Sequence, residues 1–282
     1  MQELHSFLSV ASGFKAVFLD SYGVLKNYQG LIAGVENAVA TLREQGVAIR
    51  ILTNDASRSQ EQQVAGFNKL GLPGLQTHEV ITSGMMAKHF LQHKITGGKI
   101  GYMGTENSAR YILQAGLEHV SIRDIDMDKL HEISAFVFLD DEGFDWNTDI
   151  NKTINLLRST KIPVIVANSD KLYPVSKNDV AVATGGIAKL VENLLGRKFM
   201  HFGKPDTQMF TYAYNRLKRL MPVTKPDILM VGDNLHTDIL GGNKFGVKTC
   251  LVLSGNTSES SVEQQIMSTG IIPDFVCRSI TT

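Results

Sequence analysis

Short runs of β-branched and aromatic residues alternate along this chain with longer segments whose apolar residues recur every three or four positions. The short runs fit strands, and the longer segments fit helices that bury one face. Such alternation is typical of an α/β protein with mainly parallel sheets, because a helix is the usual crossover between parallel strands. The expected strands are 15–19, 48–53, 79–82, 99–103, 135–139, 163–167, 228–231, 249–253 and a short final one at 275–277; the expected helices are 35–45, 59–70, 109–115, 148–159, 187–195 and 207–221.

Composition and charge narrow the function classes. The chain has 282 residues, with 28 Lys and Arg against 28 Asp and Glu, so its formal net charge is zero. Nucleic-acid binders normally carry a basic excess, so we expect neither a nucleic acid nor a membrane surface as partner. The 2 cysteines exclude a disulfide framework and fit a reducing compartment. We see no signal peptide and no apolar run of membrane-spanning length, and we therefore expect a cytoplasmic protein.

Polar motifs follow several of the expected strands or apolar runs, which is where ligands bind in an open α/β sheet. In chain order these residues are Asp20, Thr53 and Asn54, Lys204 between a glycine and a proline, and Asp233 with Asp238. Each motif by itself has a plain explanation as a helix cap or a solvated turn. The whole set in this order is harder to explain so, because a carboxylate directly after a buried strand is costly unless it is paired.

The order of these motifs resembles the haloacid dehalogenase superfamily, and the details resemble its class IIA branch, the NagD-type and p-nitrophenyl phosphate phosphatases. Further matches are Asn168-Ser169-Asp170 followed by Pro174, and the stretch Ala183-Thr184-Gly185-Gly186-Ile187. The resemblance covers nearly the whole chain, from about Phe14 to Leu253. It implies a Rossmann-like, doubly wound parallel-sheet core with an inserted α/β cap domain of the class II type.

The spacing of the motifs places the inserted domain between the second and the third. The stretch from Thr53 to Lys204 exceeds what the core needs by about one small domain. We therefore expect residues 1–83 and 199–282 to form the core and residues 84–198 to form the cap. The expected strands 99–103, 135–139 and 163–167 would then form the sheet of the cap.

The resemblance also implies a role for each motif. Asp20 would be the nucleophile that forms an aspartyl-phosphate, which water then hydrolyses. Lys204 would stabilise the charge on the transferring phosphoryl group. The hydrogen-bond donors to phosphate would be the side chains of Thr53 and Asn54 and the backbone N–H groups around Tyr22 and Gly23.

Mg²⁺ is the cofactor that the resemblance implies, and a hard cation of this kind prefers oxygen ligands. Its ligands would be Asp20, the carbonyl of Tyr22 and Asp233, with Asp238 holding a metal-bound water or orienting Lys204. On the cap, Asn168 and Asp170 would face the site and contact the substrate. A turn with a solvated Asp170 explains that pair equally well. The acidic run 140–145 is more readily a solvated loop than a second cation site.

The first motif departs from the phosphatase pattern at Tyr22. Phosphatases of this superfamily usually carry a second Asp at that position, which protonates the leaving alkoxide and later activates water. A phenol with a pKa of about 10 is a poor general base near neutral pH. Because a positioned acid or base contributes about 10²- to 10⁴-fold, poor leaving groups such as sugar hydroxyls should suffer most.

Three functions remain open at this point. The first is a Mg²⁺-dependent phosphatase for a small phosphorylated metabolite such as a sugar phosphate, either slow, restricted to activated leaving groups or served by another acid. The second is a haloacid dehalogenase, since these enzymes carry Asp-x-Tyr-Gly, although Asp233, Asp238 and a class II cap argue against it. The third is a phosphometabolite-binding protein without turnover. Class IIA relatives often pair through the cap, so a homodimer is expected by analogy.

Overall fold

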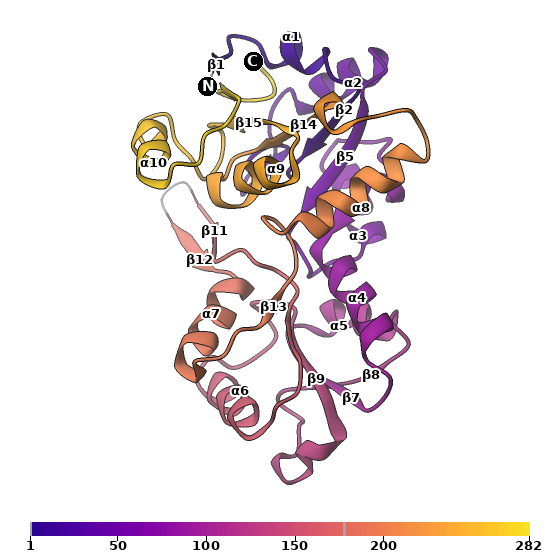
Figure 1. The fold of residues 1–282 in the computed structure, drawn as a ribbon, viewed down its shortest axis with the longest axis vertical. Helices are drawn as coiled ribbons and strands as arrows, with labels where there is room; N and C mark the ends of the chain where they lie inside the picture. Colours follow the sequence, from indigo (N-terminus) through magenta and orange to yellow (C-terminus); the bar gives the residue numbers. More distant parts are fainter. Residues whose placement is uncertain (1, 177–178) are drawn as a thin grey trace.

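The computed structural model describes residues 2–176 and 179–282. The chain folds into two units stacked end to end, each built on a parallel sheet with helices on both faces (Figure 1). The α/β fold class predicted from the sequence is confirmed. Within the described ranges, the chain has no helix whose length and apolarity would let it cross a bilayer.

The first unit is organised around a seven-stranded sheet in the order β1-β16-β15-β14-β2-β5-β6, in which every neighbouring pair is parallel. Its strands are β1 (Gln2–Glu3), β2 (Ala16–Leu19), β5 (Ala48–Thr53), β6 (Val80–Thr82), β14 (Ile228–Gly232), β15 (Lys248–Val252) and β16 (Phe275–Cys277). The chain runs outward from β2 through β5 to β6 on one side, and from β14 through β15 to β16 on the other. The topological switch point, where such sheets bind ligands, therefore lies between β2 and β14.

Alternate residues of β2 point to opposite faces of this sheet, as the pleat of a strand requires. Phe18 packs on the face covered by α8 (Thr207–Lys218) and α9 (Leu240–Phe245). Val17 and Leu19 pack on the other face, which α1 (Phe7–Ala11), α2 (Val35–Glu44) and α3 (Gln60–Lys69) cover. Further out, α10 (Val262–Thr269) packs beside β15 and β16. Burial on both faces explains why β2 and β14, the two strands at the switch point, contain no polar side chain.

The second unit holds a five-stranded parallel sheet in the order β13-β10-β9-β7-β8. Its strands are β7 (Lys99–Met103), β8 (Glu118–Ser121), β9 (Ile133–Phe138), β10 (Val164–Val166) and β13 (Met200–His201). Helices α4 (Ser83–Lys94) and α5 (Glu106–Leu113) cover one face, and α6 (Thr148–Ser159) and α7 (Thr184–Leu195) cover the other. The three runs expected to pair in a second sheet do so, and β8 and β13 extend that sheet at its edges.

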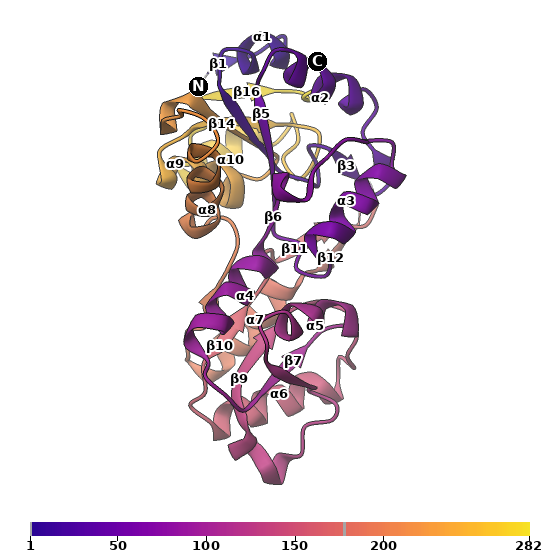
Figure 2. The same cartoon turned by 90° about the vertical axis from the view of Figure 1, so that its right-hand side faces the viewer.

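Helix α4 joins the two units (Figure 2). It begins directly after β6, where the side chain of Thr82 accepts a hydrogen bond from the Met85 N–H. The helix therefore includes residue 84, where the cap was expected to begin. Its Phe90 ring packs against Phe202 with centroids 5.6 Å apart. One apolar cluster therefore continues from the core sheet through α4 to the second sheet. The domain boundaries at residues 83 and 198 stay a prediction.

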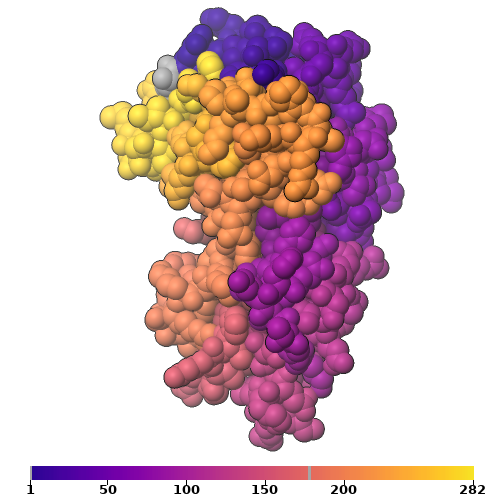
Figure 3. All heavy atoms as spheres, turned by 45° about the vertical axis from the view of Figure 1, so that its right-hand side comes forward, coloured from indigo at the N-terminus to yellow at the C-terminus, as the bar shows by residue number. Residues whose placement is uncertain are grey.

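Two antiparallel hairpins lie outside both sheets, β3 (Lys26–Asn27) with β4 (Gly30–Leu31), and β11 (Leu172–Pro174) with β12 (Val180–Val182). The second hairpin reaches from the cap toward the core (Figure 1). In the space-filling view the two units meet at a waist that is narrower than either of them (Figure 3). The sequence did not predict these hairpins, because strands of only two or three residues are too short to show an alternation of apolar and polar side chains. Short helical turns complete the fold, namely η1 (Thr77–Glu79), η2 (Met127–Glu132), η3 (Lys225–Asp227) and η4 (Leu235–Ile239).

Removal of the Phe138 side chain tests the core of the second unit. Phe138 is fully buried in β9 and packs against Phe136 and Phe199. Phe138→Ala should lower the free energy of unfolding by about 3–5 kcal/mol, because it removes apolar contacts and leaves a cavity. Urea unfolding followed by circular dichroism measures this. Leu113→Ala is the control: its side chain is 54% exposed, and the change should stay within about 0.5 kcal/mol.

Candidate active site

The carboxyl ends of three adjacent parallel strands bring the predicted motifs to one edge of the core sheet. Asp20 follows β2, Thr53 ends β5, and Asp233 follows β14, and these strands are neighbours in the order β14-β2-β5. The pairing of β2 with β14 continues one residue beyond the strand, since the Asp20 N–H donates to the Val231 carbonyl at 2.9 Å. Lys204 reaches the same edge from the segment after β13.

Lys204 forms the centre of the site. Its Nζ lies 2.5 Å from Asp20 Oδ1 and 2.7 Å from Asp238 Oδ1, and its side chain is 2% exposed. Burial by itself disfavours an ammonium group, but the charges of Asp20 and Asp238 outweigh it and raise the pKa of Lys204 above its usual range. Lys204 is therefore a permanent cation next to the carboxylate predicted to be the nucleophile.

Asp20, Asp233 and Asp238 each offer a carboxylate oxygen within 4.8 Å of the others. Asp233 is 1% exposed, and its Oδ1 is buried without a hydrogen-bond partner. Its Oδ2 accepts from the backbone N–H and the side-chain amide of Asn256, at 2.6 and 2.8 Å. Burial, followed by the negative charge of Asp20, raises the pKa of Asp233. A bound cation would favour the ionised form of this carboxyl group. An orphaned oxygen among clustered carboxylates fits a divalent cation.

Gly23 allows the first motif to approach this cluster. Its φ of +82° lies in the left-handed region, and a Cβ on Gly23 would meet Asp233 Oδ2 at 2.2 Å. Gly23 was also predicted to donate its N–H to phosphate. The structure differs, because that N–H donates to the Lys26 carbonyl at 2.7 Å and closes a tight turn.

Asn54 connects the segments of the site through three hydrogen bonds. Its amide nitrogen donates to Asp170 Oδ1 at 2.9 Å and to the Lys204 carbonyl at 3.0 Å, and its Oδ1 accepts the Lys204 N–H at 2.7 Å. Both amide hydrogens are thus used within the protein, unlike the phosphate-donor role predicted for Asn54. Position 203 requires a glycine, because its φ is +102° and a Cβ there would lie 2.5 Å from Asn54 Oδ1.

Tyr22 points toward the cap. Its hydroxyl donates to the Pro174 carbonyl of β11 at 2.8 Å. Burial, followed by the charge of Asp233, raises the pKa of this phenol above its ordinary value. The hydroxyl therefore connects core and cap through a hydrogen bond. It is less readily deprotonated at neutral pH than the hydroxyl of free tyrosine.

A cavity of about 550 Å³ lies between the core and the cap. The predicted site residues that line it are Asp20, Tyr22, Thr53, Asn54, Asn168, Asp170, Lys204 and Asp233. Asp238 lies behind it, fully buried against Lys204, and burial raises its pKa to about 7. Asn168 and Asp170 both face this cavity, so the plain turn with a solvated Asp170 is not what the structure has. Asn168 Oδ1 accepts the Asp170 N–H at 2.9 Å, which shapes the loop.

The sequence did not reveal several residues of this cavity. Asn256 lies beyond β15, in a Ser- and Thr-rich stretch without a motif of its own. The expectation of a solvated loop is wrong for Asp140, which is 9% exposed and lines the cavity. Burial raises its pKa to about 6. Tyr173 Oη donates to Asp141 Oδ2 at 2.9 Å on the same wall. The apolar run before Asp140 is a signal that could have pointed to this wall, since it ends as the other site strands do.

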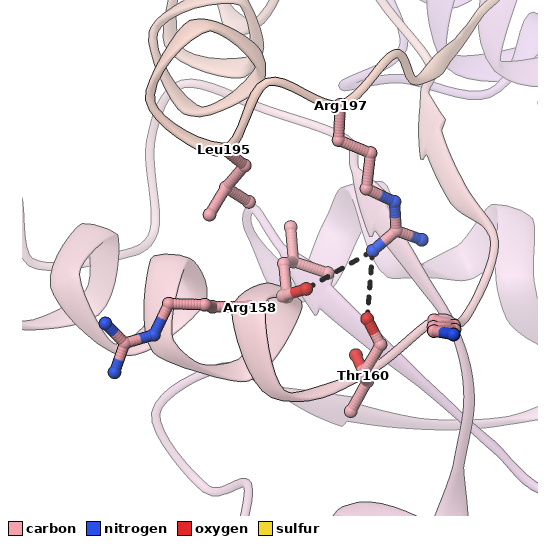
Figure 4. A pocket seen from close by; sticks show the side chains of 6 residues that line it. Arg158, Thr160, Leu195 and Arg197 are labelled. Atoms are coloured by element: carbon pink, nitrogen blue, oxygen red, sulfur yellow. Dashed lines mark hydrogen bonds between the residues drawn. The ribbon is translucent and has the colours of Figure 1, made fainter.

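A second hollow, of about 290 Å³, lies between the ends of α6 and α7 (Figure 4). Arg197 projects into it and donates to the carbonyls of Leu157 and Thr160, at 3.2 and 3.1 Å, and to that of Ile162. These bonds satisfy carbonyls at the end of α6 that have no helical partner. The hollow is thus a product of helix termination, and its guanidinium is already engaged.

Comparison with known proteins agrees with this geometry. The haloacid dehalogenase-like hydrolase family model matches residues 17–118, and a HAD-hydrolase-like model matches residues 201–282. A possible sugar phosphatase of the HAD superfamily from Cytophaga hutchinsonii is 49% identical and superposes with a TM-score of 0.96, covering 100% of this chain and 99% of that one. Chronophin from Bos taurus is 26% identical over 94% of this chain and 90% of its own length. NagD from Escherichia coli K-12, at 23% identity, shares the fold with a TM-score of 0.74, covering 95% of this chain and 97% of that one.

The chain therefore belongs to the haloacid dehalogenase superfamily of hydrolases, as its motifs predicted. The predicted resemblance to the NagD-type branch holds at the level of the fold. Its relatives are named phosphatases, and the predicted enzyme class, a phosphoric monoester hydrolase, is confirmed at this level.

Substitution of Gly23 tests whether the cluster around Asp233 binds a metal. Gly23→Ala places a methyl group against the Asp233 carboxylate, and we expect Mg²⁺ affinity to fall by about 10–100-fold. Isothermal titration calorimetry measures the affinity without any substrate.

Gly46→Ala is the matched control for that experiment. Gly46 has a similar φ of +77°, but a Cβ there would meet nothing within 4 Å. It carries the same backbone strain without the contact, so its Mg²⁺ affinity should match the wild type. Equal loss of affinity in both variants would contradict a metal site at Asp233.

Proposed function

We propose that the protein is a Mg²⁺-dependent phosphatase that hydrolyses a small phosphorylated metabolite through an aspartyl-phosphate on Asp20. The observation that carries this proposal is the Lys204 ammonium held between Asp20 and Asp238, with the unpaired Asp233 oxygen beside them. This arrangement offers a nucleophile, a fixed cation and a metal site at one end of a cavity that suits a small ligand.

Mg²⁺ would be held by Asp20, Asp233 and the Tyr22 carbonyl, with Asp238 beside them, and when bound it would supply positive charge to the phosphate oxygens. The protein's own groups carry the chemistry. Asp20 attacks phosphorus while Lys204 and the Thr53 hydroxyl hold the phosphoryl oxygens. Water then attacks the aspartyl-phosphate and regenerates the Asp20 carboxylate. Asn54 and Gly23 support the site without donating to phosphate.

A hydroxyl-bearing metabolite such as a sugar phosphate is the substrate class we favour. The cavity wall opposite Asp20 carries Asp140, Asp141 and Tyr173, whose oxygens can accept hydrogen bonds from hydroxyl groups. The name of the Cytophaga hutchinsonii relative, a possible sugar phosphatase, points the same way.

Loss of the nucleophile should abolish turnover. In the presence of Mg²⁺ we expect release of inorganic phosphate from p-nitrophenyl phosphate and from sugar phosphates. Asp20→Asn should lower this rate by about 10³-fold or more, and EDTA should abolish it in the wild type. Asp128→Asn, an exposed position on the cap that does not line the cavity, is the control and should retain the wild-type rate.

Two other experimental outcomes would contradict the proposal. Metal-dependent ligand binding without phosphate release from any activated phosphate would identify a binding protein. Halide release from a haloacid without added metal would identify a dehalogenase, the activity that Tyr22 and Gly23 by themselves would allow.

The phenol of Tyr22 should not act as the general acid, because its hydroxyl hydrogen is donated to the Pro174 carbonyl. Tyr22→Phe should therefore change turnover of an alkyl phosphate and of p-nitrophenyl phosphate by the same factor. Steady-state kinetics on both substrates give the ratio. Tyr214→Phe, which removes a similar hydroxyl-to-carbonyl bond in the core, is the control. Selective loss of alkyl phosphate turnover in Tyr22→Phe would make the phenol the acid.

A further inference from the structure

A phosphatase with Tyr22 in its first motif needs another group to protonate the leaving group. We propose that Asp170 of the cap is that group: it donates a proton to the leaving oxygen and later takes one from the attacking water. This inference rests on the proposed phosphatase function and adds a catalytic residue to it.

The loop that carries Asp170 is fixed on the core site from several sides. Asn54 donates to Asp170 Oδ1 at 2.9 Å, and the same amide contacts the backbone of Lys204. Ser169 Oγ donates to the Phe202 carbonyl at 2.8 Å, and the Tyr22 hydroxyl donates to Pro174 at the other end of the segment. Asp170 is therefore held beside the nucleophile's end of the cavity and is not free to turn into solvent.

The start of α7 supports the same loop. A Cβ on Gly185 would lie 2.6 Å from the Ser169 backbone, and one on Gly186 would lie 2.6 Å from the Lys171 carbonyl. The two glycines thus let the loop pack directly on the first turn of the helix. This packing explains the glycine pair after Thr184, which lacks the Gly-x-Gly-x-x-Gly spacing of a nucleotide-binding loop.

Two other carboxyl groups of the cavity, those of Asp55 and Asp140, accept hydrogen bonds through both of their oxygens. Asp55 accepts from Ser57 through Oδ1 and from Gln63 and Arg58 through Oδ2. Asp140 accepts from Thr105 and from a backbone N–H, one bond to each oxygen. Asp170 uses Oδ1 for Asn54, and in the described part of the chain its Oδ2 forms no hydrogen bond. That oxygen is therefore available to a substrate.

The surroundings of Asp170 suit proton transfer near neutral pH. Burial raises its pKa to about 6, while Lys204 and the bond from Asn54 limit the rise and Asp20 and Asp55 add to it. A carboxyl group tuned in this way can exist in both protonation states under working conditions. By contrast, burial raises the pKa of the Tyr22 phenol further above neutral pH.

The proton balance of the reaction closes with this assignment. In the first step Asp20 forms a bond to phosphorus, the bond from phosphorus to the leaving oxygen breaks, and the Asp170 carboxyl proton goes to that oxygen. The products are an alcohol and the aspartyl-phosphate, with Asp170 ionised. In the second step Asp170 takes a proton from water as the water oxygen attacks phosphorus. The bond between phosphorus and the Asp20 oxygen breaks, which releases inorganic phosphate and restores the Asp20 carboxylate, and Asp170 is protonated again.

Asp170→Asn tests the assignment, because an amide keeps an oxygen that can accept from Asn54 but cannot transfer the proton. Turnover of alkyl phosphates should fall by about 10²- to 10⁴-fold, while p-nitrophenyl phosphate, whose leaving group needs no acid, should lose less than about tenfold in aspartyl-phosphate formation. Pre-steady-state kinetics should then show a burst of p-nitrophenol, since the aspartyl-phosphate forms and hydrolyses slowly. Asp128→Asn is the matched control.

The pH dependence provides a readout that a structural role would not move. Asp170 donates only when protonated, so wild-type turnover of an alkyl phosphate should decline as the pH rises through about 6. That decline should be absent in the residual activity of Asp170→Asn.

A carboxylate at position 22 should rescue the variant. The double variant Tyr22→Asp, Asp170→Asn should recover alkyl phosphate turnover relative to Asp170→Asn, and the gain should exceed that of Tyr22→Asp in the wild-type background. An equal loss on alkyl and aryl phosphates with no burst and no rescue would overturn the role of Asp170 and leave the phosphatase function standing. Absence of phosphate release from the wild type would overturn the phosphatase function itself.

Discussion

The buried ion pairs of Lys204 with Asp20 and Asp238 are the interaction on which the rest of the site depends. An ammonium that is 2% exposed is tolerable only because carboxylates lie 2.5 and 2.7 Å away. Loss of one partner from such a group typically costs about 3–5 kcal/mol, because it leaves a buried charge uncompensated. The ends of β2 and β14 and the segment after β13 are therefore held together by charge as well as by the sheet.

The cap matters as much as the core, and two kinds of contact couple them. The apolar contacts that continue through α4 are non-directional and hold the two units together without fixing the position of individual atoms. The hydrogen bonds from Asn54 and Tyr22 to the loop that carries Asp170 are directional and place particular atoms over the cavity. In this protein the tyrosine of the first motif has become an anchor for the cap. Under the proposed role of Asp170, the acid that the first motif lacks at position 22 is supplied by the cap.

The sequence predicted most of the fold because its strong signals are local. The strands 48–53 and 99–103 and the helix 148–159 match the structure residue for residue, since their periodicity and length leave little choice. The weak elements were missed for the same reason. The hairpin of β11 and β12 has three residues on each strand, too few for a pattern. Helix α4 shows mixed polarity along its length because it packs on both units at once, so no single apolar face appears in its sequence.

Within the site, the sequence by itself determined which residue types were available, in what order, and that Asp20, Thr53 and Asp233 would follow strands of one parallel sheet. It could do so because strand ends of a parallel sheet share an edge. Only the tertiary structure decided what each group touches: that Asn54 donates to Asp170 and Lys204, that the Gly23 N–H closes a turn, that Asp140 is buried, and that Tyr22 bonds to Pro174. These contacts join residues far apart in the chain, and their geometry depends on how two units pack, which no local pattern encodes.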